Sequence, residues 1–326
     1  MASLSDAQLE FLKKFRQGVM SEKDIVHYVG NPGWEAALGS SIPLVIQRFK
    51  RDNLIHPLNP DSDLISIAAS KLRTPDLKKF LSARNAKVSG TKNQLVQRCI
   101  ELDFKAVQAM IAEDTYWATT EHGDALVDEH LGAKLAAQSK CEDDVLALLS
   151  INDYASAAKR RAAYNASLTF SPGMGCSWTD WDIKRDAEVV KYIFEQCPLA
   201  LTLLHPGDIR RARPLAAVLY LFGGKVSARL YSLVDERNPD VIGGRTRKHQ
   251  EAIARLLQFY AIGQANLRQW KAEGIKAVKV ASCDDSCEGC KQLSRRSHQI
   301  DNAPQLPYSL CTSSCGCRCC YVPVVR

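Results

Sequence analysis

The residues best suited to chemistry are cysteines, and most of them are crowded near the end of this 326-residue chain. Eight of the twelve lie between residues 283 and 320: Cys283, Cys287, Cys290, Cys311, Cys315, Cys317, Cys319 and Cys320. The N-terminal stretch MASLSDAQLEFLKKF lacks the apolar segment of a secretory signal, so we expect a reducing compartment. Clustered cysteines there indicate metal binding in preference to disulfides. The scattered remainder are expected to be small buried hydrophobes: Cys99, Cys141, Cys176 and Cys197.

The spacing Cys287-x-x-Cys290 lets two thiolates reach one tetrahedral ion from a single tight turn. We favour Cys287, Cys290, Cys311 and Cys317 as the ligands, with Cys319 as the main competitor. The order of strand, cysteine pair, loop and second cysteine group is typical of a zinc ribbon, which favours structural zinc over an iron–sulfur cluster. Because eight thiols exceed four ligands, a second metal, a multinuclear cluster and spare thiols all stay open.

A second feature is a local block of positive charge between residues 71 and 98. Eight basic side chains and a single acid, Asp76, give this block a net charge of +7, which equals the net charge of the whole chain. So local an excess indicates a polyanionic partner. Candidate contacts to nucleic-acid phosphates are Lys78, Lys79, Arg84, Lys87, Gly90, Thr91, Lys92 and Arg98.

The pattern of this block predicts two short helices joined by a turn. Thr74-Pro75 is expected to begin the first helix, and Thr91 to cap the second. A glycine turn that opens a helix presents backbone N–H groups and a positive dipole end to phosphate. Such contacts position a duplex and carry little sequence information.

The stretch KLRTPDLKKFLSARNAKVSGTKNQLVQRCIEL resembles the SAP domain, a small helix–turn–helix module that binds DNA. The residues that carry the resemblance are Leu72, Leu77, Lys78, Leu81, Val88, Ser89, Gly90, Lys92, Leu95 and Arg98. Asn85 stands where the family usually has glycine, and Asn tolerates a left-handed turn. Ala86 replaces a large aliphatic residue, which leaves the small core with less apolar volume. The resemblance implies binding of double-stranded DNA.

Residues 245–325 resemble the C-terminal part of phage Mu-like minor head (head morphogenesis) proteins. The matching pieces are Gly274-Ile275, Cys287-x-x-Cys290, Leu306-Pro307 and Cys317-Arg318-Cys319. The family's glycine after the first cysteine pair is missing, and its histidine before the last Cys-x-Cys is replaced by a cysteine-rich run. This resemblance implies phage or prophage association, with capsid or portal proteins as further partners.

The chain carries no recognisable catalytic motif, and we assign no catalytic residue. A glycine-rich phosphate loop, a nucleophile elbow and a His-Glu-x-x-His signature are all absent from the sequence. Weaker candidates are an acidic pair at Asp284-Asp285, a base or ligand at His298, and a stacking pair at Trp178 and Trp181. Because residues 105–244 contain no motif we can interpret, a DNA-processing enzyme such as a nuclease stays the alternative.

Hydrophobic periodicity predicts a mainly α, multidomain protein. We expect an N-terminal helical unit at 1–56, the SAP-like module at 62–104, a central helical domain at 105–244, and a long helix with a zinc-ribbon end at 245–326. Residues 56–61 are predicted to be a linker and residues 171–175 a loop. Strands are expected at 116–119 and 275–281, and helices at 4–18, 22–29, 34–38, 124–138, 142–149, 154–166, 186–196, 208–221, 225–234 and 245–273.

Composition limits the class of protein. With 46% hydrophobic residues the chain is not disordered, and no apolar run reaches the ~18 residues of a membrane-spanning helix. We expect a soluble, cytoplasmic protein, virion-associated if the phage resemblance reflects its role. The function predicted from the sequence is non-enzymatic DNA binding by a zinc-containing protein, with a structural role in a phage head as a further alternative.

Overall fold

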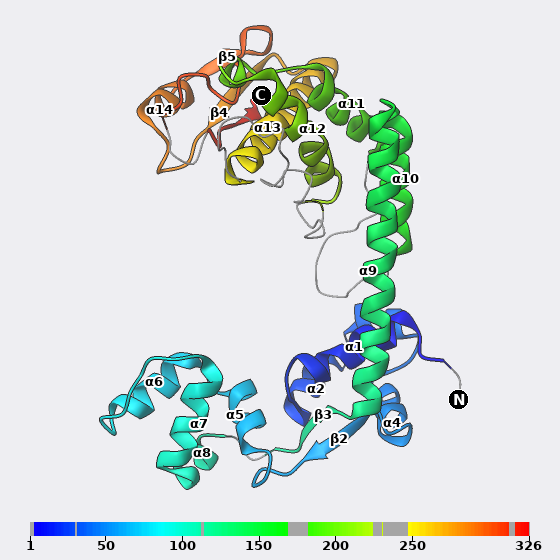
Figure 1. Cartoon of the computed structure of the whole chain (residues 1–326), viewed down its shortest axis with the longest axis vertical. Helices are drawn as coiled ribbons and strands as arrows, with labels where there is room; N and C mark the ends of the chain where they lie inside the picture. Colours follow the sequence, from blue (N-terminus) through cyan, green and yellow to red (C-terminus); the bar gives the residue numbers. More distant parts are fainter. Residues whose placement is uncertain are drawn as a thin grey trace. The chain divides into compact units, whose positions relative to one another are not determined.

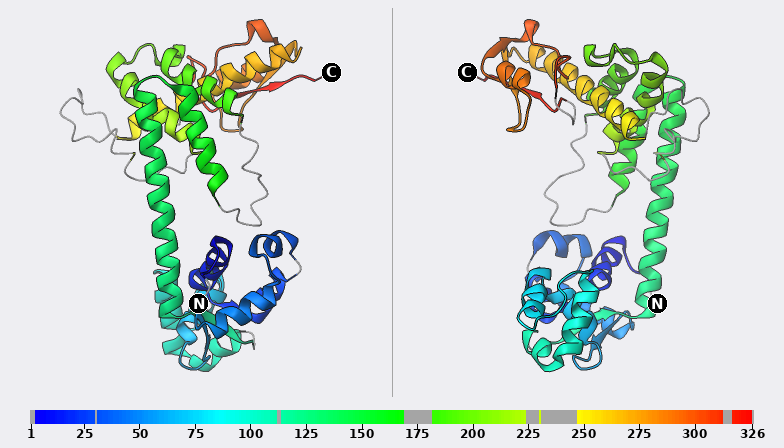
Figure 2. Two further views of the ribbon diagram at one scale, coloured as in Figure 1. Left: turned by 90° about the vertical axis from the view of Figure 1, so that its right-hand side faces the viewer. Right: turned by 60° about the vertical axis from the view of Figure 1, so that its left-hand side comes forward.

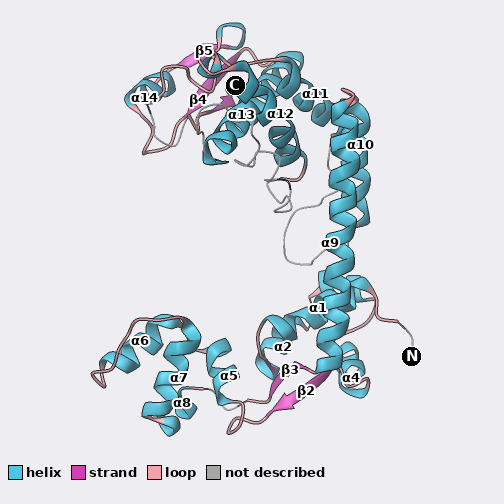
Figure 3. Ribbon diagram, viewed as in Figure 1, coloured by secondary structure: helices cyan, strands magenta, loops and turns pink. Residues whose placement is uncertain are grey.

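The computed structural model describes residues 3–29, 31–111, 114–168, 182–223, 230, 247–312 and 317–325. It is mainly helical, as predicted, with two small antiparallel sheets (Figure 3). The loop at 171–175, the helix at 225–234, Trp178, Trp181, Cys176 and Cys315 lie outside the described residues. The chain forms two compact units, one up to Leu135 and one from Ala136 onward, which are treated separately below. The four-part division drawn from the sequence stays a prediction.

The first unit begins with four helices, of which α1, α2 and α4 are labelled in Figure 1. They are α1 (Asp6–Gln17), α2 (Glu22–Tyr28), α3 (Pro32–Leu38) and α4 (Ile42–Arg51). Ser5 and Ser21 each cap a helix through a reciprocal bond with the residue three positions on. An aromatic core of Phe11, Phe15 and Phe49 holds the helices together, and each of these rings is at most 1% exposed.

A three-stranded sheet in this unit joins distant parts of the chain. Its strands are β1 (Met20–Ser21), β2 (Ile55–Leu58) and β3 (Tyr116–Thr119), in the order β1-β3-β2. The strand at 116–119 is confirmed, but the linker predicted at 56–61 is partly wrong because residues 56–58 belong to β2. Local composition indicates a break at His56-Pro57, yet the pairing partner lies sixty residues away. Pro57 is tolerated because β2 is an edge strand.

Four short helices lie between the paired strands β2 and β3. They are α5 (Leu64–Lys71), α6 (Thr74–Ser82), α7 (Lys92–Leu102) and α8 (Phe104–Met110). At the end of β2, Leu58 pairs with Tyr116 at the start of β3. The chain therefore leaves the sheet and returns to it at neighbouring positions, with the helices α5–α8 as an insertion.

The longest helix, α9 (Glu121–Ser150), is continuous in both views of Figure 2. Two helices at 124–138 and 142–149 were expected from the pattern, and this prediction is wrong. No glycine or proline separates the two segments, and Gln138 donates a hydrogen bond of 2.8 Å to Glu142 across the expected break. The polar run therefore continues the helix, with nothing to end it before Asn152 at φ 59°.

The second unit packs the end of α9 and the helices that follow it around an alanine- and leucine-rich core that includes Leu215, Ala216 and Ala254. After α9 come α10 (Tyr154–Ser167), α11 (Ile183–Glu195), the short 3-10 turn η1 (Leu199–Leu201), α12 (Pro206–Leu221) and α13 (Arg247–Ala272). The helices predicted near these positions are confirmed to within a few residues. None of the described helices is both long and apolar enough to cross a membrane.

The end of the chain forms a second small sheet beside α13. Gly274, at φ 84°, ends the helix in the left-handed region that glycine adopts without strain. The sheet has the order β5-β4-β6, with antiparallel strands β4 (Ala277–Ala281), β5 (Ser297–Gln299) and β6 (Cys320–Pro323). Between β4 and β5 lies the helix α14 (Glu288–Ser294), and the turn η3 (Ile300–Asn302) follows β5. The strand predicted at 275–281 is present two residues shorter.

Candidate nucleic-acid interface and metal centre

The helices α5–α8 share a small apolar core that fixes the turn between α6 and α7. Leu77 and Leu81 from α6 and Leu95 from α7 are fully buried. Thr91 caps α7 as predicted, in a reciprocal capping box with Gln94. The predicted start of α6 is wrong by one residue: Arg73, and not Thr74, occupies the cap position, and Thr74 already lies in the helix.

Two residues of the turn adopt backbone conformations that the sequence pattern required. Asn85 has φ 53°, so it takes the left-handed position for which we judged asparagine acceptable. Gly90 has φ 135°, and a Cβ added there would lie 2.8 Å from Oε1 of Gln94. A larger residue at Gly90 would therefore strain the backbone and displace the capping glutamine.

Some arginines of the positive block are engaged in contacts within the protein. Arg84 donates to Asp103 at 2.9 Å, and its guanidinium lies 3.7 Å from the centre of the Phe80 ring. The pKa of Asp103 is lowered by the backbone N–H of Ala106 and by Arg84. These contacts hold the end of α6 against the start of α8, a function that the sequence does not reveal.

Arg98 makes the most informative contact of the module. Its Nη1 donates to the backbone carbonyls of Lys87 and Ser89, the second at 3.3 Å. Since the C=O and N–H of one peptide unit point in opposite directions, these contacts turn the N–H groups of Val88 and Gly90 away from Arg98. Arg98 is thus placed as a tie for the turn, whereas the sequence indicated it only as one more phosphate contact.

Four of the five lysines of the block are available to a partner, whereas Lys71 forms an ion pair with Asp24. Lys78, Lys79 and Lys87 are exposed, and Lys92 is half-buried at the first position of α7. Among the described residues none of these four has an acidic partner, in contrast to Arg73, which pairs with Asp76 at 2.9 Å. The module therefore presents unpaired positive charge on α6, on the turn and at the start of α7.

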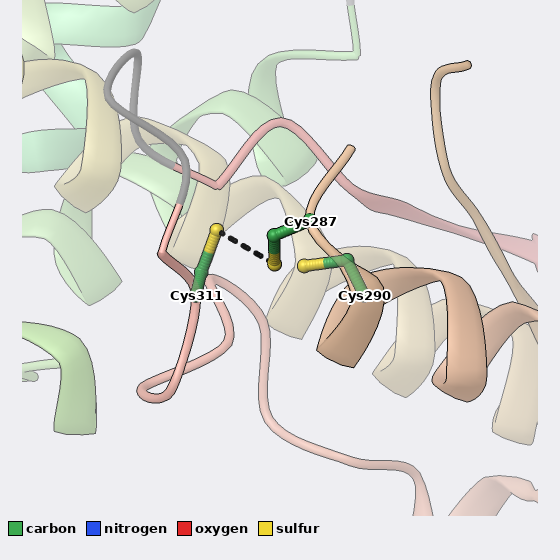
Figure 4. A group of neighbouring side chains, drawn as sticks. All are labelled: Cys287, Cys290 and Cys311. Carbon is green, nitrogen blue, oxygen red and sulfur yellow. Dashed lines mark hydrogen bonds between the residues drawn. The ribbon is translucent and has the colours of Figure 1, made fainter. Parts of the chain in front are cut away.

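In the C-terminal sheet region the structure brings together the five cysteines chosen as ligands. The Sγ atoms of Cys287, Cys290 and Cys311 lie within 4.8 Å of one another, as do those of Cys290, Cys317 and Cys319. The sulfurs of Cys287 and Cys311 are 3.7 Å apart, marked by the dashed line in Figure 4, and those of Cys290 and Cys317 are 3.8 Å apart. Four sulfurs at ~2.3 Å from a tetrahedral zinc lie about 3.8 Å apart, whereas a disulfide requires about 2.05 Å.

Three parts of the chain position the thiols. Cys287 precedes α14 and Cys290 lies in its first turn, while Cys311 comes from the long loop and Cys317 and Cys319 lead into β6. Backbone N–H groups of Cys290 and Thr312 lower the pKa of the Cys287 thiol to about 6. Burial raises the pKa of Cys290, and raises that of Cys319 to about 11. This donor set fits a soft, thiophilic cation, and the cysteine cluster can hold a metal ion.

Three other residues of the tail, Asp285, His298 and Tyr321, have structural partners. Asp285 forms an ion pair with Arg318, which lies between Cys317 and Cys319. Nε2 of His298 lies 2.9 Å from the carbonyl oxygen of Leu293. The Tyr321 hydroxyl donates to the carbonyl of Pro304 at 2.7 Å and accepts from the N–H of Leu306 at 3.0 Å. Tyr321 thereby joins the loop at Pro304–Leu306 to the sheet, a contact that no sequence motif predicts.

The scattered cysteines are placed separately from this cluster. Cys99 and Cys141 are fully buried in apolar cores, as expected, and burial raises the pKa of both thiols. Cys197 is only half-buried.

Comparison with known proteins identifies one family in this chain. The family model of the SAP domain matches residues 68–103, which covers α6, the turn and α7. No curated protein and no solved structure matches the chain. The resemblance noted in the sequence of residues 72–98 is therefore confirmed for this module.

Proposed function

We propose that the protein binds double-stranded DNA through the SAP-like module without catalysing a reaction. The observation that carries this proposal is a SAP-matching helix pair whose lysines Lys78, Lys79, Lys87 and Lys92 lack acidic partners in the described part of the chain. Lysines on a fixed turn attract phosphates, and outward N–H groups next to them add donors. Contacts of this kind predict binding that is largely independent of sequence and falls steeply with salt.

The test compares two triple variants of equal charge change. Lys78→Glu, Lys87→Glu and Lys92→Glu together should abolish most duplex binding in an anisotropy titration. The control carries Lys140→Glu, Lys159→Glu and Lys279→Glu, three exposed lysines outside the module, and should bind nearly as the wild type does. For single Lys→Ala variants at the three module positions, the slope of log K against log salt should fall by about 1 each. Equal loss in both triple variants would reduce the interaction to net charge alone and remove the module from the proposal.

For the C-terminal region we propose at least one structural zinc, held by Cys287, Cys290, Cys311 and a fourth thiolate from Cys317 or Cys319. Support comes from sulfur separations of 3.7 and 3.8 Å, which suit a tetrahedral thiolate site. Such a site is closed, so the ion would stabilise the fold and perform no reaction. Elemental analysis of protein purified without added metal tests this, and iron with a visible charge-transfer band would contradict it.

The sequence also favours two alternative functions. The resemblance of residues 245–325 to phage Mu-like minor head proteins favours a phage-associated structural role, in the cytoplasm or in the virion. Co-purification with capsid or portal proteins would support that role. A nuclease would instead show metal-dependent cleavage of DNA, which the non-enzymatic proposal excludes.

A further inference from the structure

The metal centre has more thiols than a tetrahedral ion can use. Five sulfurs form two groups of three, and Cys290 belongs to both. Among the described residues no four ligand atoms lie within 4.8 Å of one another, so the ion's fourth ligand is not fixed by the positions of the sulfurs. Cys287, Cys290 and Cys311 supply three corners, and Cys317 and Cys319 both lie close to Cys290.

The backbone explains why two candidates face the same place. Residues 317–321 alternate between buried and exposed, with Cys317, Cys319 and Tyr321 buried and Arg318 and Cys320 exposed. In extended chain, side chains two residues apart point to the same side. Cys317 and Cys319 are therefore both directed toward Cys290, at 4% and 5% exposure, while Arg318 on the other side is tied to Asp285.

We propose that Cys317 and Cys319 are interchangeable fourth ligands of one ion held by Cys287, Cys290 and Cys311. This inference rests on the proposed zinc function. Whichever thiolate binds the ion, the other stays a neutral buried thiol, a state in which cysteine behaves as a small hydrophobic residue. The Arg318–Asp285 ion pair anchors the segment in both arrangements, so only a small shift of the two thiols separates them.

Two ions sharing Cys290 are the competing arrangement. Each ion would then receive only three described thiolates, which leaves one corner of each tetrahedron unfilled. A closed four-thiolate site with one spare thiol satisfies a single ion more completely. The number of ions per chain separates the two arrangements.

The experiment uses the full chain and zinc itself as the probe. Four variants are compared with the wild type: Cys317→Ser, Cys319→Ser, the double Cys317→Ser/Cys319→Ser, and Cys320→Ser. The last is the matched control, because Cys320 is exposed, adjacent to Cys319 and in neither group of sulfurs. Zinc per chain and affinity against a competing chelator are measured, with cobalt substitution to count the bound thiolates from the intensity of the sulfur-to-metal band.

We expect one zinc per chain in the wild type, the control and both single variants. Each single variant should lose only about twofold in zinc affinity, because it keeps one of the two equivalent ways to complete the site. The double variant should lose about 100-fold or more, since removal of a group that merely supports a ligand already costs about 10–100-fold. Its cobalt band should correspond to three thiolates, against four in each single variant.

Three results would overturn the inference. Loss of zinc from one single variant alone would identify a fixed fourth ligand, retention by the double variant would exclude both residues, and two zinc ions per chain would establish the shared-thiolate arrangement. All three leave structural zinc binding by the tail standing, although retention by the double variant would place the fourth ligand elsewhere. That function fails only if the wild-type protein itself contains no zinc.

Discussion

The SAP-like module and the cysteine-rich tail are segments of similar length that reach order by different means. The module buries a continuous apolar core that includes Leu77, Leu81 and Leu95. In the tail, three of the seven buried core residues are the cysteines Cys290, Cys317 and Cys319. A core in which thiols replace aliphatic side chains buries less apolar surface, so we expect the tail to need a bound metal for stability that the module draws from packing.

The largest effect is expected from removal of a metal ligand. Cys287→Ser should release the ion and leave residues 283–320 sensitive to protease, because structural zinc contributes about 10–16 kcal/mol at neutral pH. Limited proteolysis with mass analysis of the fragments measures this, and a chelator should reproduce it in the wild type. DNA affinity should stay unchanged, and a parallel loss of DNA binding would show that the two regions are not independent.

The converse experiment removes part of the module's core. Leu81 is fully buried, so Leu81→Ala should destabilise the module by about 2–5 kcal/mol. DNA binding should weaken in proportion to the unfolded fraction, while zinc per chain stays at the wild-type value. Leu102→Ala, at a 48%-exposed position of α7, serves as the control and should change neither property. Loss of zinc in Leu81→Ala would contradict the separation of the two cores.

A smaller effect tests whether Arg98 acts through the turn. Arg98→Lys keeps the charge but loses the planar fork that reaches two carbonyls, so DNA affinity should fall by about tenfold. The matched control is Arg73→Lys, at an exposed arginine that pairs with Asp76 at 2.9 Å, and it should bind normally. Hydrogen exchange of residues 86–91 should rise in Arg98→Lys without DNA present. Wild-type DNA affinity together with wild-type hydrogen exchange would show that Arg98 does not hold the turn in place.

The smallest effect concerns the helix caps of the module. Thr91→Ala removes an acceptor for the N–H of Gln94 and should cost about 1 kcal/mol of module stability. Thr74→Ala lies inside the first turn of α6 and not at its cap, so it should cost less. Thermal unfolding of the two variants side by side measures the difference. Equal losses would place the cap of α6 at Thr74, as the sequence pattern suggested.

Local features of this fold were predictable, whereas long-range ones were not. The cap at Thr91 and the left-handed backbone of Asn85 depend on neighbouring residues and are predicted from the sequence. The pairing of β2 with β3 depends on residues sixty positions apart and was missed. The periodicity predicts a break in α9 at a polar stretch, yet the helix continues because that stretch contains no helix-breaking residue.

The candidate sites show the same division. The cysteines favoured as metal ligands lie near one another in the structure, although their spacing alone could not choose among the eight thiols of the tail. Spacing did not reveal that Arg84 pairs with Asp103 or that Arg98 holds two carbonyls, since each depends on which helix faces which. Counting basic residues therefore overstated how many of them are free to meet phosphate.

The position of the module between two paired strands has a consequence for evolution by domain insertion and loss. Leu58 and Tyr116 are paired in the sheet, so the two ends of the segment that contains α5–α8 lie next to each other. A deletion of the whole segment would leave two strands that a short turn can join, and a different small domain with adjacent ends would fit the same gap. The SAP-like module is in that sense a replaceable unit, which one recombination event can add, exchange or remove while the surrounding sheet is kept.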